Sequence, residues 1–471
     1  PPDNTNDGTS LCPADKTVAD YLNDPKQNLY IANGVLAEAG SFRSTSVGKT
    51  VSTKVGFSVT QDIIATRVVK GSTVYKQSSS YGLVKMGDER LAHGDKYLYR
   101  LATKVNSVSD MAWPSGSPTE LNKEDFVNRY GQRGNGLSGY ILNDETIVSA
   151  TFDGYDEQSG LYTFSYVLDN QKATAYLLYE MRTNSGSKNF ATFQKAVITV
   201  SMDENWVVHT LSTDCEYNVP IAGGTPCKES MTEVFSDVGQ IKSFEQLPCY
   251  DFYRNYVDFS VAPPSGDDND GELPAPVLPD EPAEPEPLDV LMNMFEGYLE
   301  GAPLNARLST QVSGLPIEAD VTLVLNLQDL AKTTFSALTA NGLRVTYVND
   351  NIFAAVNGVK LRSSVDDIMQ AVNRFANTQI PSIDFDFADF DTSSLMDAMT
   401  LEFADGKAVV GMELNLGQLC VKAEFVGAEQ VDGKYAFQSA TVGVGGIELV
   451  LSAQDKTIEL LNTDEGDYVD A

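Results

Sequence analysis

Between residues 262 and 288 the chain reads APPSGDDNDGELPAPVLPDEPAEPEPL, a composition that does not build a core. This run contains eight prolines and eight acidic residues, and it has no lysine or arginine. Each proline removes a backbone hydrogen-bond donor and the like charges repel one another, so an extended spacer is expected. The sequence therefore predicts two folded domains, 15–261 and 289–471, joined by a linker at 262–288 and preceded by a polar tether at 1–14.

The first domain begins with a helical pattern and continues with strands. Apolar residues at roughly helical spacing predict a helix within 15–39, and Gly40 ends it. From Phe42 onward polar and apolar residues alternate, which predicts a series of strands. Beyond residue 102 the pattern predicts a second helix at 118–130 and three more strands at 146–153, 161–168 and 173–181. A hairpin that turns at 203–205 follows them.

The second domain repeats this plan in fewer residues. A leading helix is expected at 289–300 and an inserted helix at 364–375, with alternating strands before and after the inserted helix. Alternating strands with one apolar face need a cover, and two helices per domain are available for it. The predicted fold class is α+β, with two domains that are each a curved antiparallel β-sheet wrapped over helices.

This layout resembles the lipoprotein-carrier fold (LolA/LolB-like), and the first domain resembles envelope lipoproteins of Firmicutes that carry it. The stretches behind the resemblance are 36–49, 95–100, 162–181, 196–211 and 215–219, and the second domain matches by pattern alone. The resemblance implies a space between sheet and helices that holds acyl chains. It also implies a non-enzymatic protein that binds lipid or a lipid-modified partner.

Composition and motifs limit the partners and the chemistry. The chain has 66 acidic and 33 basic residues, a formal net charge of −33, which repels nucleic acid and anionic membrane surfaces. No apolar run reaches the ~18 residues that span a bilayer. The loop at 43–50 lacks the first glycine of a phosphate-binding loop, and no serine-nucleophile motif has its partners. The acidic run at 384–391 lacks calcium-loop spacing, so no catalytic residue, cofactor or metal site is predicted.

The five cysteines leave the disulfide pattern open. Cys215 and Cys227 bracket a loop rich in glycine and proline, so a bridge between them is one hypothesis. Cys12 and Cys249 form a second candidate pair, and the odd count leaves at least one thiol free. Five free, buried thiols are an equal alternative. Cys420 alternates with the apolar residues of its strand and is expected to be free.

The predicted ligand groove lies in the second domain, between its two helices and its sheet. Its expected lining is apolar and comes from both layers: Leu291, Phe295, Ile368, Met369 and Val372 from the helices, and Val321, Leu323, Val345 and Leu414 from the strands. Methionine side chains are flexible enough to adapt to acyl chains. The alternative is that these residues form an ordinary core.

Three function classes follow from these patterns. The leading hypothesis is a secreted or lipid-anchored bacterial cell-surface protein that binds a hydrophobic ligand or a lipid-modified partner, with cell-wall components as further partners. The second is a structural or interaction module whose groove is filled by its own side chains. The third, a hydrolase of envelope glycans, needs two facing carboxylates, and the sequence singles out no such pair. The polar start of the chain is expected to follow a removed secretion or lipoprotein signal.

Overall fold

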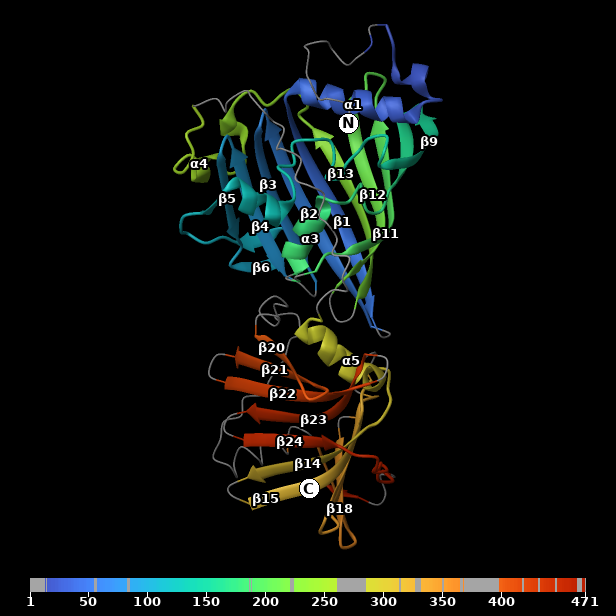
Figure 1. Cartoon of the computed structure of the whole chain (residues 1–471), viewed down its shortest axis with the longest axis vertical. Helices are drawn as coiled ribbons and strands as arrows, with labels where there is room; N and C mark the ends of the chain where they lie inside the picture. The colour runs from blue at the N-terminus through green and yellow to red at the C-terminus, as the bar shows by residue number, and fades with distance from the viewer. Residues whose placement is uncertain are drawn as a thin grey trace.

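The computed structural model contains two large, mainly antiparallel sheets with helices packed on them (Figure 1). No helix within the described ranges is long and apolar enough to cross a membrane. Most of the predicted tether and linker lies outside those ranges. The described residues are 13, 15–54, 57–82, 85–185, 187, 189–220, 224–260, 285–312, 315–326, 332–349, 351–364, 367, 398–416, 419–430, 433–444, 447–463 and 468–470.

The first sheet has 11 strands in the order β8-β5-β4-β3-β2-β1-β13-β12-β11-β10-β9. Its long central strand β1 pairs with β2 on one side and with β13, far along the chain, on the other. The strands β6 and β7 form a separate ribbon. The bounds are β1 Ser41–Lys54, β2 Phe57–Lys70, β3 Thr73–Tyr81, β4 Met86–His93, β5 Lys96–Leu101, β6 Lys104–Ser107, β7 Asp110–Ala112, β8 Thr119–Leu121, β9 Ile147–Asp156, β10 Leu161–Leu168, β11 Thr192–Met202, β12 Val208–Val219 and β13 Thr225–Ser236.

Short helices cover parts of the first sheet. Helix α1 begins after Asp24, whose side chain accepts the backbone N–H of Gln27, and it ends at Gly40 in the left-handed conformation. The helices of this part of the chain are η1 Val18–Tyr21, α1 Pro25–Ala39, α2 Lys123–Tyr130, α3 Leu177–Ser185, η2 Phe244–Gln246 and α4 Tyr250–Tyr253.

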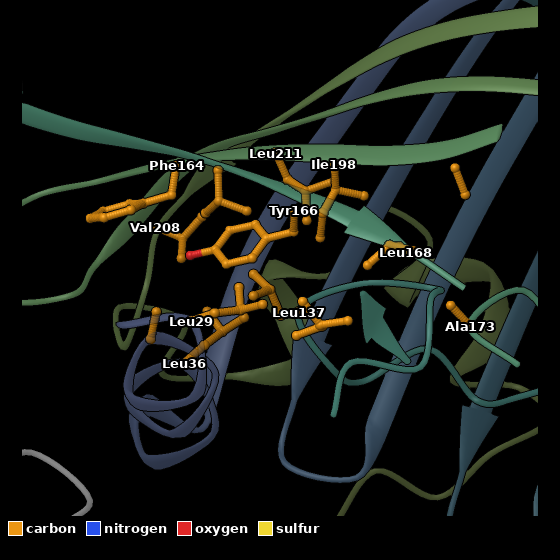
Figure 2. Packing of buried hydrophobic residues seen from close by; sticks show 14 of the residues in the cluster. Leu29, Leu36, Leu137, Phe164, Tyr166, Leu168, Ala173, Ile198, Val208 and Leu211 are labelled. Atoms are coloured by element: carbon orange, nitrogen blue, oxygen red, sulfur yellow. The ribbon is translucent and has the colours of Figure 1, made fainter. Parts of the chain in front are cut away.

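The largest core lies between α1 and the inner face of the first sheet (Figure 2). Leu29 and Leu36 of the helix face Tyr166 and Ile198 of the strands, and all four side chains are buried. Each such side chain contributes roughly 1.5–3 kcal/mol relative to an exposed one. The Tyr166 hydroxyl donates to the carbonyl of Pro25 at 2.9 Å, which fixes the start of α1 on the sheet.

A second core lies on the opposite, outer face of the same sheet. Tyr75, Leu91 and Leu98 from β3, β4 and β5 are buried there beneath the segment that carries η2 and α4. This segment shields the outer face on the β3–β5 side, so the sheet is covered on both faces there.

The second sheet has 12 strands in the order β20-β21-β22-β23-β24-β14-β15-β16-β17-β18-β19-β25. Helix α5 (Pro287–Leu299) packs on it, and at Gly427 a β-carbon would lie 2.7 Å from Cε of Met294, so glycine allows the close approach. The bounds are β14 Leu304–Val312, β15 Leu315–Val324, β16 Thr334–Thr339, β17 Arg344–Val348, β18 Asn351–Val356, β19 Val359–Ser364, β20 Met399–Ala404, β21 Lys407–Leu416, β22 Leu419–Glu429, β23 Tyr435–Val444, β24 Ile447–Ala453 and β25 Val469–Asp470.

The predicted fold class, α+β with each sheet wrapped over helices, is wrong. The described chain is mostly antiparallel strand, and its short helices cover only parts of the two sheets. Residues 173–181, predicted as a strand, instead lead into α3. The prediction assumed a continuous helical cover, whereas much of the first sheet's inner face lies under loop residues and a cavity. The inserted helix expected at 364–375 falls almost entirely outside the described residues.

Candidate functional site

A cavity of about 490 Å³ lies on the inner face of the first sheet. Its floor consists of residues from β1 to β4 and from β11 to β13, and its cover includes α3 and residues 130–140. The wall is mainly apolar, and one of its residues, Leu288, comes from α5. The apolar side chains of the wall include Val59, Ile63, Met86, Leu177, Met181, Phe193, Leu211, Val219, Met231 and Leu288.

The cavity exists because the central strands carry small side chains on their inner face. A β-carbon on Gly48 of β1 would collide with the carbonyl oxygen of Ser230 on the paired strand β13, so glycine is required here. Large residues at the neighbouring positions would fill the space, since protein interiors pack densely. The small lining residues are Ser46, Thr50 and Ser52 on β1, Ala65 on β2, and Ser78 and Ser80 on β3.

Arg67 ties the loop of the cover to the sheet. Its guanidinium on β2 pairs with the carboxylate of Glu233 on β13 at 2.7 Å. An arginine has five N–H donors in a fixed fork, and Arg67 makes five hydrogen bonds. Arg67 is therefore fully engaged and is not available to a ligand. Its partners are the hydroxyl of Ser44, the carbonyls of Gly134, Gly136 and Leu137, and Glu233.

Glu180 ties α3 to the sheet on the other side of the cavity. Its two carboxylate oxygens accept from Lys76 at 2.8 Å and from Arg90 at 3.2 Å. Burial opposes ionisation of Glu180, but the charges of Arg90 and Lys76 outweigh it and lower the pKa to about 2. The Arg90 guanidinium also lies over the ring of Tyr130, 4.0 Å from its centroid. This ion pair network holds the cover in place.

Glu229 on β13 is the exception among the acids of the wall. One of its oxygens accepts from the hydroxyls of Tyr217 at 3.0 Å and Thr50 at 3.3 Å. Within the described part of the chain it forms no ion pair, and burial raises its pKa. Its other titratable neighbours include Glu180, whose charge also raises this pKa, the Tyr140 hydroxyl and the thiols of Cys215 and Cys227. The polar end of the cavity, defined here as Thr50, Thr213, Tyr217 and Glu229, is thus held by neutral groups.

The disulfide predicted between Cys215 and Cys227 is not formed, and both thiols are free. The two cysteines lie on the paired strands β12 and β13 but not opposite each other, because Cys215 faces Glu229 and Cys227 faces Tyr217. Each thiol has another partner: the Cys215 sulfur lies 2.9 Å from the Tyr140 hydroxyl. Burial raises the pKa of Cys215 to about 11. Cys249 and Cys420 are also free, and Cys12 lies outside the described residues.

The start of α5 contacts the first part of the chain near this cavity. Oε1 of Glu286 accepts from the Ser187 hydroxyl at 2.7 Å and from the Asn189 amide at 3.2 Å. Glu286 is buried and directly precedes the helix that supplies Leu288 to the wall. These contacts place the end of the predicted linker beside the cavity.

The predicted groove residues lie elsewhere, in the second sheet and its helix. Leu291, Phe295 and Leu323 pack around the core beneath α5, whereas Val321 and Val345 belong to a separate small cluster. Leu414 lies on β21 and is half-buried. None of these six lines the cavity of the first sheet. The other three, Ile368, Met369 and Val372, lie outside the described residues, so the predicted groove stays a prediction.

Sequence reasoning missed this cavity because it searched for methionine and leucine. The signal that marks the cavity is the opposite one, small polar residues at alternate positions of long strands, as in Ser44, Ser46, Gly48 and Thr50 of β1. Such a strand face leaves space, whereas rows of large apolar residues fill it.

Comparisons with known proteins give no family for this chain. No family model matches the sequence, and no curated protein matches it. Among solved structures, the lipoprotein LppX of Mycobacterium tuberculosis is 12% identical over 39% of this chain and 100% of its own, with a TM-score of 0.26. LprF of Mycobacterium bovis is 7% identical over 38% and 97%, with a TM-score of 0.25. A DUF1329 family protein of Desulfovibrio piger is 12% identical over 49% and 97%, with a TM-score of 0.19.

Proposed function

We propose that this chain is a non-enzymatic binding protein of the cell envelope that holds a lipid-like ligand in the cavity of its first sheet. The observation that carries the proposal is the mainly apolar cavity of about 490 Å³ beneath α3. Small-molecule sites typically have volumes of about 300–1,000 Å³, an apolar wall and a few placed polar groups. The ligand is amphipathic, because the same wall carries Glu229 and Tyr217.

Burial of an alkyl chain is the main source of free energy for this binding. Each methylene removed from water contributes about 0.8 kcal/mol. A chain of about ten carbons therefore contributes about 8 kcal/mol, from which the loss of translational and rotational freedom is subtracted.

The ionisable groups of the wall are arranged for structure and not for catalysis. Glu180 and Glu233 are held by cations, and Cys227 is a poor nucleophile because burial raises its pKa. Of the three classes considered, the interaction module remains the competing function, and the glycan hydrolase has no supporting geometry in the described residues.

The test uses a substitution that fills the cavity and a matched one that does not. Ser46 lines the cavity, whereas Val47, the next residue of β1, points outward and is 55% exposed. We expect the neutral dye N-phenyl-1-naphthylamine to bind the full chain at micromolar concentration. Ser46→Trp should weaken this binding at least tenfold, and Val47→Trp should leave it unchanged. If the unsubstituted protein binds no dye and carries no co-purified lipid in native mass spectrometry, the interaction module replaces this proposal.

A further inference from the structure

Most charged groups around the cavity belong to ion pairs, although Nε and Nη1 of Arg90 and Oδ2 of Asp88 are buried without hydrogen-bond partners in the described residues. Arg67 is held by Glu233, and Lys76 and Arg90 are both held by Glu180. Asp88, behind Arg90, accepts from the Ser78 hydroxyl. Glu229 alone among the acids of the described wall has only neutral hydrogen-bond partners.

The contacts of Glu229 leave one side of its carboxyl group for a ligand. Thr50 and Tyr217 both donate to Oε2, and Oε1 has no protein partner in the described residues. The hydroxyl of Thr213, also in the wall, is buried with no partner among the described residues. Buried polar groups without partners are rare in folded proteins, and a ligand group that pairs with them gains affinity.

The cations of the described wall are already paired, Arg67 with Glu233 and both Lys76 and Arg90 with Glu180. Lys76 is on β3, and β2 and β1 separate that strand from β13, which carries Glu229. A carboxylate placed beside Glu229 would lose its hydration and meet a like charge or an acid group, whose hydrogen-bond partners in the described residues are hydroxyls and not cations.

We propose that Glu229 makes this cavity select amphipathic molecules with a hydroxyl or amine head group over those with a carboxylate. The inference rests on the proposed function and adds the chemical class of the head group. An ionised Glu229 accepts from either head group and balances the charge of an ammonium. A protonated Glu229 donates to a hydroxyl, which is both a donor and an acceptor.

The experiment compares three ligands with the same chain: 1-dodecanol, dodecylamine and dodecanoate. Each displaces N-phenyl-1-naphthylamine from the full chain at pH 8. We expect the alcohol and the amine to bind at least tenfold more tightly than dodecanoate. Glu229→Gln keeps an acceptor for Thr50 and Tyr217, so the fold is retained. In this variant the affinity for the amine should fall at least tenfold, and the affinity for the alcohol should change by less than threefold. The affinity for dodecanoate should rise.

The control and the outcomes separate this inference from the proposed function. Glu216→Gln, on the same hairpin but with an exposed side chain paired to Lys228, should change none of the three affinities. The head-group selection is overturned if dodecanoate binds as tightly as the alcohol, or if Glu229→Gln leaves the affinity for the amine unchanged. Either result leaves lipid binding intact. If none of the three displaces the dye, the proposed function itself is wrong.

Discussion

Glu180 on α3 lies 2.8 Å from the ammonium of Lys76 on β3, although 104 residues separate the two in sequence. Since burial disfavours the charged carboxyl, the pair exists only because Lys76 and Arg90 together outweigh that penalty. Ion pairs therefore join the cover of the cavity to its floor.

Removing this charge should destabilise the protein at neutral pH. The pKa of Glu180 is lowered from 4.5 to about 2, so its ionised form is stabilised by about 3 kcal/mol. This contribution is present above pH 4.5 and is lost as the pH falls toward 2. We expect Glu180→Gln to lower the free energy of unfolding by about 3 kcal/mol at pH 7, measured by urea denaturation, and to lose less stability on acidification. A change under 1 kcal/mol would contradict the network.

Glu229 should show the opposite pH dependence. Its pKa is raised by burial, so the folded protein holds a proton that the unfolded chain releases above pH 4.5. Stability should therefore fall as the pH rises from 4.5 through the raised pKa, by up to ~1.4 kcal/mol per pH unit. Glu229→Gln should reduce this slope in denaturation curves recorded across that window, and Asp88, whose pKa burial also raises, should keep a part of it, whereas Glu216→Gln should leave the slope unchanged.

Arg67 should not be replaceable by lysine. Lysine cannot span the carbonyls of Gly134 and Gly136 and the carboxylate of Glu233 at once. We expect Arg67→Lys to cost about 3 kcal/mol and to speed amide exchange in the loop at 134–137. The matched change Arg43→Lys, at a more exposed pair with Asp237, should cost less than about 1 kcal/mol. Equal effects of the two substitutions would show that the loop does not depend on Arg67.

The thiols should differ in their reaction with an alkylating reagent at pH 8. Cys420 is partly exposed and should react first, whereas Cys215, Cys227 and Cys249 are buried and should react only on unfolding. Peptide mapping without reductant should recover Cys215 and Cys227 unlinked. A peptide that joins them would restore the bridge predicted from the sequence.

The division into two folded domains stays a prediction, and proteolysis tests it. The run at 262–288 has no site for trypsin, because it lacks lysine and arginine, but the Glu272–Leu273 bond suits a glutamate-specific protease. We expect the first cut there, followed by two fragments that each unfold cooperatively on heating. Earlier cuts within the sheets, or fragments that are unfolded when separated, would mean that the halves depend on each other.

The sequence predicted local structure better than long-range structure. The alternation of β1 and β2, the helix at 25–39 and the hairpin around 203–205 follow from neighbouring residues, and the structure confirms them. The pairing of β1 with β13 joins residues almost 200 positions apart and leaves no local signal. Residues 173–181 contain a short apolar run that fits either a strand or a helix, and packing against the sheet decides between them.

The candidate site depends on the same long-range pairing. Ser46, Glu229 and Tyr217 line the same cavity only because β1 pairs with the hairpin of β12 and β13, which lies far along the chain. Each of these residues alone is typical of a polar strand face. The spacing of these residues in the sequence does not indicate a cavity, so the ligand groove was predicted in the other half of the chain.

The register of β1 against its neighbouring strands determines the volume of the cavity. Serine, glycine and threonine at 44, 46, 48 and 50 point inward, while Arg43, Val47, Lys49 and Val51 point outward. A slip of one residue would exchange the two sets and drive bulky and charged side chains into the interior. Gly48, the residue that fits against Ser230, opposes such a slip, so a single missing side chain helps to set the size of the molecule the protein can carry.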